Sequence, residues 1–458
     1  MNLRLSFVLL AGGVATCLAA PPPVADAAYS VETRAGSAPE AQVYAQRIER
    51  ELREDILPFW MTHVVDRNHG GFYGEISNDL VVKKNAPRGA LLTSRILWTY
   101  SAAYRRYQDP KYLEMARYAY RDLIDHFWDA EQGGLFWSIT AEGKPLRVEK
   151  QVYGQVFGIY ALAEYYRITQ EPEALSHATL IYQRLEEHAH DPVFGGYFEV
   201  CTRDWRRNAA TESATSGEAE GKKSGSAGPP SFSRPRDVVG ARGSKSQNTH
   251  LHVLEAFTNL LRVWPDPGLR KSQSELIELM LTKITDPQTH HLILFMNDDW
   301  SGRGDDISFG HDIEASWLLN EAAEVLGAEA LRARVKAASL EMARVTREQA
   351  IDTDGSLLYE ANSCGITNSS REWWPQAEAM VGLYNAYQLS GDERYREAAF
   401  QVWNYIDAHL VDHKYGEWFR AVTKEGIVSR EPKVSLWKCP YHNGRACLEM
   451  IERLESKP

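Results

Sequence analysis

Hydrophobic and polar positions along the chain follow a pattern that returns about every 62 residues. Each unit has an Asp-led turn with one or two glycines and then a short aromatic or aliphatic stretch, as at residues 66–73, 129–136 and 191–198. Weaker copies begin at Asp286, Asp352 and Asp412. Self-similarity at a fixed period is typical of repeat architectures, in which each unit buries its apolar face against the next.

Between successive turns lie two apolar-periodic stretches of helical length. The predicted pairs are 87–107 with 110–127, 149–168 with 172–188, 248–264 with 266–284, 307–326 with 328–348, and 372–389 with 392–410. A last helix at 436–454 has no partner after it, so we pair it with the opening helix at 39–64. The pattern predicts an all-α fold, an (α/α)6 barrel of six helical hairpins with short β-turn and strand connections. Its inner helices would run parallel and begin at one rim.

Two segments depart from this pattern. Residues 206–245 are rich in Ser, Gly, Ala, Pro and charge, and we expect a disordered surface insertion there, either tolerated or acting as a lid, within one domain spanning 38–458. Residues 1–28 read as a secretory signal peptide, with Arg4 before an apolar core too short for a good membrane span. We therefore expect a periplasmic or secreted protein without membrane insertion after cleavage, although Cys17 leaves lipidation open.

The amino-acid composition limits the kinds of molecule that the protein is expected to bind. With 458 residues, 44% apolar and 25% charged, the chain is a normal globular protein, and its net charge of -11 argues against nucleic acid as a partner. The 13 Trp and 22 Tyr offer faces on which sugar rings can stack, although aromatics also fill space between helices. No Cys-x-x-Cys pair is present, so neither a zinc knuckle nor a redox motif is indicated.

Residues that can carry chemistry gather near the predicted starts of the inner helices. His252, His311 and His442 fall near three of these starts. A single histidine there is usually a surface or capping residue, so the interpretation depends on all three occupying equivalent places. His252 and His311 each precede a glutamate by three residues, Glu255 and Glu314, which could fix the imidazole tautomer or form a surface pair.

An arginine lies within an apolar run of the first predicted inner helix. An unpaired charge there would be costly, so Arg95 is either ion-paired or directed at a ligand oxygen. The remaining candidates near the same rim are Tyr153, Asn248, Trp317, Trp373, Trp374 and Trp437.

Three kinds of site could be built from these rim residues. Three histidines and a glutamate could bind zinc, but no local ligand pair such as His-Glu-x-x-His is present. A glycosidase needs two carboxylates, and the rim has more histidines than free acids. Histidines suit proton abstraction from carbon 2 of an open-chain sugar, with a second imidazole returning a proton to the opposite face. Arg95, Asn248 and the helix N-termini could stabilise the enediolate intermediate.

Five motifs, in order along the chain, resemble the N-acylglucosamine 2-epimerase superfamily and, within it, the cellobiose 2-epimerases. They are Thr93-Ser-Arg95, Asn248-Thr-His-Leu-His252, Phe309-Gly-His-Asp-Ile-Glu314, Glu372-Trp-Trp-Pro-Gln-Ala-Glu378 and Trp437-Lys-Cys-Pro-Tyr-His-Asn443. The resemblance implies an (α/α)6 barrel that inverts carbon 2 of the reducing-end glucose of β-1,4-linked disaccharides, without metal or cofactor.

The resemblance also implies roles. His311 and His442 would be the acid/base pair, with His252, Arg95 and Asn248 at the reacting end. Glu314 would support His311. The sugar would be held by Trp374 and Trp437, with Trp317, Trp373 and Tyr153 helping to line the cleft. We expect a monomer acting on a small oligosaccharide. An aldose–ketose isomerase, an N-acylglucosamine 2-epimerase and a non-catalytic sugar-binding barrel remain alternatives.

Overall fold

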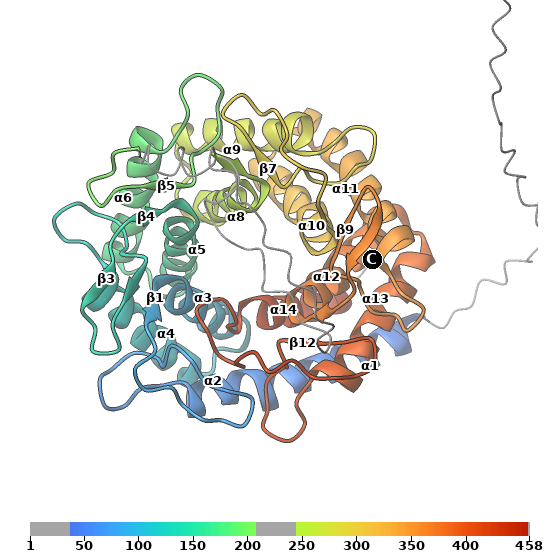
Figure 1. The fold of residues 1–458 in the computed structure, drawn as a ribbon, viewed down its shortest axis with the longest axis horizontal. Helices are drawn as coiled ribbons and strands as arrows, with labels where there is room; N and C mark the ends of the chain where they lie inside the picture. Colours follow the sequence, from blue (N-terminus) through green and yellow to red (C-terminus); the bar gives the residue numbers. More distant parts are fainter. Residues whose placement is uncertain (1–36, 208–243, 457–458) are drawn as a thin grey trace, which may run out of the picture.

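The helices of the protein form two concentric rings (Figure 1). A computed structural model describes residues 37–207 and 244–456, so the predicted signal peptide at 1–28 lies outside the described residues. The inner ring consists of α3 (Ala90–Tyr107), α5 (Val152–Thr169), α8 (Gln247–Val263), α10 (Phe309–Leu326), α12 (Trp373–Ser390) and α14 (Tyr441–Glu455). Each inner helix contacts the next, and α14 contacts α3, which closes the ring.

An outer ring surrounds these helices, each outer helix packing on an inner one. Its members are α4 (Pro110–Asp122) continued by η2 (Leu123–Phe127), α6 (Pro172–His188), α9 (Pro267–Leu279) continued by η3 (Met280–Ile284), α11 (Glu329–Ala350), and α13 (Glu393–Tyr405) continued by η4 (Ile406–Leu410). The opening segment α1 (Ser37–Arg50), η1 (Glu51–Ile56) and α2 (Leu57–His63) completes the ring, with α1 packed on α14. The predicted (α/α)6 barrel with paired chain ends is confirmed.

Burial differs between the two rings in the way their sequences require. In α5 every residue from Val152 to Tyr165 is buried, as expected for a helix that is apolar all round. The outer helices bury one face only and begin with strong start signals. Asp109 and Asp266 cap α4 and α9 by accepting backbone N–H groups, and a proline follows each cap.

The Asp-led turns join each outer helix to the next inner one, at the end where the inner helices begin. Asp129 Oδ1 accepts the backbone N–H groups of Glu131 and Gln132, both at 3.2 Å, and Gly133 and Gly134 adopt φ of 74°. Such φ values favour glycine. The turns at Asp66, Asp191, Asp286 and Asp412 have the same aspartate contacts. The repeated sequence unit is therefore a repeated turn.

Buried cations tie several of these turns to the chain that leads into the next inner helix, a feature the sequence analysis missed. Lys150 Nζ lies 3.0 Å from Asp129 Oδ2, and Lys245 Nζ lies 2.7 Å from Asp191 Oδ2. Lys433 and Arg371 bind Asp412 and Asp352 in the same way. We had placed Lys245 at the end of the insertion, but it begins β6 (Lys245–Ser246). Residues 206, 207 and 244 are described as well, and the remainder of the predicted insertion, residues 208–243, lies outside the described residues.

Short strands precede five of the inner helices, and for all but β6 we had predicted residues of the strand as the first helical residues. They are β1 (Arg88–Gly89), β4 (Lys150–Gln151), β6, β8 (Ile307–Ser308) and β11 (Arg371–Glu372). Their antiparallel partners are β2 (Ser138–Ile139), β5 (Val200–Cys201), β7 (Phe295–Met296), β9 (Glu360–Asn362) and β12 (Ala421–Val422), with β3 (Pro145–Arg147) and β10 (Gly365–Asn368) extending two of the sheets. The last inner helix begins at Tyr441 rather than 436, because Pro440 disfavours helical geometry in the residue before it.

Candidate active site

The starts of the inner helices enclose a cavity of about 350 Å³, including its opening. Its walls contain ten of the eleven predicted site residues. They are Arg95, Tyr153, Asn248, His252, His311, Glu314, Trp373, Trp374, Trp437 and His442. The parallel inner helices therefore bring residues from all six hairpins to one place, as the repeat predicted.

The three histidines meet in this cavity, as predicted. We had expected them at equivalent positions of their helices, and that expectation is wrong. His252 is the sixth residue of α8, His311 the third of α10 and His442 the second of α14. Trp374 of α12 packs against two of them, with ring centroids 4.6 Å from His311 and 5.5 Å from His442. Since α12 lies between α10 and α14 in the ring, these two imidazoles reach the cavity from either side of Trp374.

Each histidine is held through its Nδ1 atom, which leaves Nε2 as the ring nitrogen available to the cavity. His252 Nδ1 lies 2.8 Å from Glu255 Oε2, confirming the predicted pair. His442 Nδ1 lies 2.6 Å from Glu378 Oε1. The partner of His311 Nδ1 is the Ser308 hydroxyl at 2.7 Å. Our expectation that Glu314 supports His311 is wrong, because the guanidinium of Arg445 holds that carboxylate instead.

Glu314 combines a bound oxygen with one that has no protein partner. Its Oε1 accepts from Arg445 Nη2 at 2.6 Å, and Oε2 has no hydrogen-bond partner among the residues of the two described segments. Burial and the nearby Glu378 raise the pKa of Glu314 well above its usual value. Burial also raises the pKa of Glu378, which accepts from Arg445 and from the Trp317 indole. Glu314 Oε2 is therefore an oxygen that can meet a ligand hydroxyl.

Arg95 brings a positive charge to the cavity wall. Its guanidinium carbon lies 4.2 Å from the Phe157 ring centroid and 4.6 Å from that of Tyr441. Nη2 donates to the Tyr153 hydroxyl at 2.9 Å, and Nη1 donates to the Trp437 carbonyl at 3.3 Å. Within the described part of the chain Arg95 has no carboxylate partner. Of the two interpretations of its charge, the structure favours contact with a ligand oxygen.

Trp317 does not line the cavity, contrary to our prediction. It is the ninth residue of α10, nearly two turns beyond His311, and so lies below the cavity floor. Its indole N–H donates to Glu378 Oε2 at 3.1 Å, and the guanidinium of Arg445 lies 4.7 Å from its ring. Trp317 therefore supports the groups that hold His442.

The electrostatics of the site favour neutral imidazoles. Burial lowers the pKa of His252 to about 4 and that of His311 to about 3. Burial, with the charges of Arg95 and Arg445, lowers the pKa of His442 well below its usual value. Neutral imidazoles can accept protons at physiological pH, so the cavity contains several bases and one nearby cation.

Other chemistries fit this geometry less well. Only one of the ten lining residues is acidic, whereas glycoside hydrolysis requires two carboxyl groups at the scissile bond. Glu314, Glu378 and His442 place possible metal-ligand atoms within 4.8 Å of one another. Arg445 Nη2 already binds Oε1 of both glutamates, so a guanidinium occupies the place beside these oxygens that a metal ion would need.

A closed ring of inner helices with neutral histidines around an aromatic cavity defines an (α/α)6-barrel enzyme suited to proton transfer. The chain matches the family model of N-acylglucosamine 2-epimerase (GlcNAc 2-epimerase) over residues 71–214 and 233–445, and it belongs to this family of isomerases.

Relatives within the family extend over almost the whole chain. A cellobiose 2-epimerase of Bacteroides fragilis is 40% identical over 412 residues, covering 90% of this chain and 99% of the relative. The N-acylglucosamine 2-epimerase of Mus musculus is 25% identical over 430 residues, covering 90% and 92%. The solved structure of a cellobiose 2-epimerase from Bacillus thermoamylovorans B4167 has a TM-score of 0.81 and 38% identity, covering 90% of this chain and all of that one.

Sequence reasoning missed three residues of the site: Ser308, Glu378 and Arg445. Glu378 stood at the end of a recognised motif without a role. Arg445 precedes Ala446 and Cys447 in a buried helix, so the argument applied to Arg95, that a charge within an apolar run needs a purpose, would have found it.

Proposed function

We propose that the protein is a disaccharide 2-epimerase that converts cellobiose to glucosyl-mannose. The observation that carries this proposal is the pair of imidazoles, His311 and His442, on either side of Trp374 in the cavity. Inverting a carbon needs two proton-transfer groups on opposite faces of the substrate. The similarity to cellobiose 2-epimerases, at up to 40% identity, supports the choice of substrate.

The reaction follows from these groups. Nε2 of one imidazole removes the proton from carbon 2 of the open-chain aldehyde, and the electron pair moves onto the carbonyl oxygen to give an enediolate. Arg95 and Asn248, at the reacting end, stabilise this negative charge. The second imidazole, protonated at Nε2 when it acts as the acid, returns a proton to the opposite face of carbon 2 and is left neutral. The first keeps the proton that it removed until the two rings exchange protons with solvent. His252 assists ring opening at the same end.

The aromatic residues and Glu314 hold the sugar. The rings of Trp373, Trp374 and Trp437 offer faces to the two pyranose units, and Tyr153 fixes Arg95. Glu314 Oε2 contacts a sugar hydroxyl. No metal or cofactor is invoked, because the imidazoles move the protons and Arg95 balances the charge.

Incubation of the purified protein with cellobiose, in the presence of a chelator, tests the proposal, with the reducing end followed by NMR. Glucosyl-mannose is the expected product. A ketose would assign an aldose–ketose isomerase, in which the proton returns to carbon 1. Conversion of N-acetylglucosamine but not cellobiose would assign an N-acylglucosamine 2-epimerase, and binding without conversion would assign a non-catalytic barrel.

We further propose that the enzyme is exported as a monomer after removal of residues 1–28, because that segment has the pattern of a secretory signal. None of the helices in the described ranges is long and apolar enough to cross a membrane. Cell fractionation and N-terminal sequencing test export. An intact N-terminus in the cytoplasmic fraction would contradict it, and light scattering measures the oligomeric state.

A further inference from the structure

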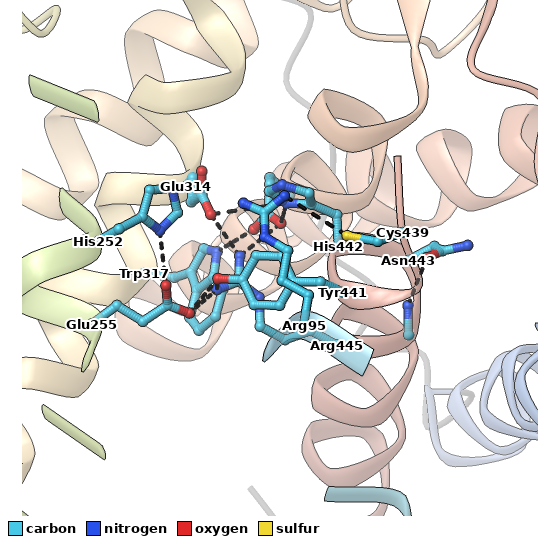
Figure 2. A network of polar contacts seen from close by, with 12 residues as sticks. Arg95, His252, Glu255, Glu314, Trp317, Cys439, Tyr441, His442, Asn443 and Arg445 are labelled. Carbon is cyan, nitrogen blue, oxygen red and sulfur yellow. Dashed lines mark hydrogen bonds and ion pairs between the residues drawn. The ribbon is translucent and has the colours of Figure 1, made fainter. Parts of the chain in front are cut away.

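One buried arginine binds carboxylates from three other inner helices beneath the cavity (Figure 2). Arg445 of α14 is 1% exposed and contacts Glu255 of α8, Glu314 of α10 and Glu378 of α12. Arg445 is not among the residues that line the cavity, so it acts through other groups. A guanidinium offers five N–H donors in a fixed plane, which allows it to hold several carboxylates at once.

Two of these carboxylates also hold a cavity histidine. Glu255 binds Arg445 through Oε1 and His252 Nδ1 through Oε2, the latter at 2.8 Å. Glu378 Oε1 lies 2.7 Å from Arg445 Nη2 and 2.6 Å from His442 Nδ1. A continuous chain of contacts therefore runs from His252 to His442 with Arg445 at its centre. Figure 2 shows the end of this chain at His252 and Glu255.

The arginine determines which partner in each Glu–His pair has the proton. An arginine can only donate hydrogen bonds, so it favours ionised carboxylates, which can only accept them. The pairs then require Nδ1–H on both rings, and Nε2 is left without a proton on the side of the cavity. Without the guanidinium, a buried carboxyl would favour its neutral form and could donate to Nδ1, which would place the proton on Nε2.

We propose that Arg445 is a positioning residue that holds His252 and His442 together in the Nδ1–H tautomer, with both Nε2 atoms ready to accept a proton. The proposal rests on the proposed function for its catalytic consequence, whereas the tautomers are a property of the protein alone. The other charged or titratable groups that face this arginine are Tyr441, whose hydroxyl also contacts Glu255, and Glu314.

The direct test is the 15N NMR spectrum of the histidine side chains in the intact protein at neutral pH, with the signals assigned from His252→Asn and His442→Asn variants. We expect the Nδ1–H tautomer for both rings in the unaltered protein. Finding Nε2–H on either ring would overturn the proposal before any arginine variant is made, whether or not the protein converts cellobiose.

The Arg445→Met variant tests the cause. We expect both rings to shift toward the Nε2–H tautomer, and kcat to fall about 100-fold or more while KM changes less than about threefold. The acid limb of the pH profile should also move to higher pH, because burial, the Arg95 charge and the Arg445 charge lower the pKa of His442 and the variant removes the last of these. Unchanged tautomers and pH profile in a folded variant would contradict the proposal.

Two further variants separate positioning from a general loss of stability. Arg445→Lys keeps the charge but not the planar fork, so it should restore the pH profile partly and the rate less. Arg88→Lys is the matched control, because Arg88 is also buried and binds a carboxylate, that of Asp122 on α4. It should leave the histidine tautomers unchanged. An equal change in both lysine variants would mean that Arg445 acts only on stability.

Discussion

The Nδ1 atom of His311 lies 2.7 Å from the hydroxyl oxygen of Ser308, whereas the same atom of the other two cavity histidines faces a carboxylate. A hydroxyl can donate or accept a hydrogen bond, so His311 can hold either tautomer. In a reversible epimerisation each ring of the pair removes a proton in one direction and returns one in the other, and the partner of His311 suits both states.

This contact gives a first prediction. Ser308→Ala should lower kcat about tenfold in both directions of the reaction, because the ring loses its orienting hydrogen bond, with little change in KM. Ser308 makes no side-chain capping bond to α10, so the helix should remain intact. Ser316→Ala, on the same helix with its hydroxyl bound to a backbone carbonyl, is the control. Steady-state rates that match the control would contradict this role of Ser308.

A second prediction concerns the cation at the cavity wall. Tyr153→Phe removes the hydroxyl that accepts from Arg95 at 2.9 Å, and we expect a loss in kcat/KM of about 10- to 150-fold because hydrogen bonds to charged groups contribute about 1.5–3 kcal/mol. Tyr165→Phe, at the far end of the same helix, loses only a contact to Glu171 and should retain full activity. Equal kinetics for the two variants would show that Arg95 needs no such support.

A third prediction follows from the buried ion pairs of the Asp-led turns. Lys433→Met leaves the Asp412 carboxylate buried without its cation, which should lower the free energy of unfolding by about 3–5 kcal/mol. Lys424→Met removes an exposed charge 3.9 Å from Asp352 and should change it little. Urea denaturation measures both. A Lys433→Met protein as stable as the Lys424→Met control would refute the role of the pair.

A fourth prediction concerns pH. Burial raises the pKa of Glu199 to about 7, although the Ser246 and Thr249 hydroxyls donate to it. Between its unfolded value of 4.5 and this value, the folded state binds more protons, so stability falls as the pH rises through that window. Glu199→Gln removes this dependence and should gain about 3 kcal/mol relative to the unaltered protein between about pH 4.5 and pH 8.

Thermal unfolding at several pH values measures the fourth prediction. Glu425→Gln is the control, since it removes the same charge from an exposed position and should run parallel to the unaltered protein. A Glu199→Gln curve that also runs parallel would mean that Glu199 titrates normally in the folded state.

The sequence predicted the barrel because its repeat depends on local requirements. An aspartate that accepts two backbone N–H groups and a glycine with positive φ are needed at each strong turn, so both remain visible as letters. The starts of three inner helices were placed two or three residues early where a two-residue strand precedes the helix, as at Lys150. A strand of that length has no periodicity to distinguish it from a helix.

The cavity was predicted almost completely because its residues belong to recognisable motifs, whereas the groups beneath it were not. Arg445 and Glu255 are 190 residues apart, and no spacing rule connects them. Glu314 follows His311 by three residues, as Glu255 follows His252, yet only His252 and Glu255 form a hydrogen bond. Both glutamates bind Arg445, so the difference lies in His311, whose Nδ1 contacts the Ser308 hydroxyl instead.

Deuterium incorporation tests the central claim most directly. The purified protein is incubated with cellobiose in D2O with chelator, alongside its His311→Ala and His442→Ala variants, and the reducing end is followed by NMR. We predict glucosyl-mannose labelled with deuterium at carbon 2, and a fall in turnover of about 100-fold or more in either variant. Epimerisation that leaves carbon 2 unlabelled throughout, or normal turnover in the His442→Ala protein, would contradict a two-histidine proton transfer.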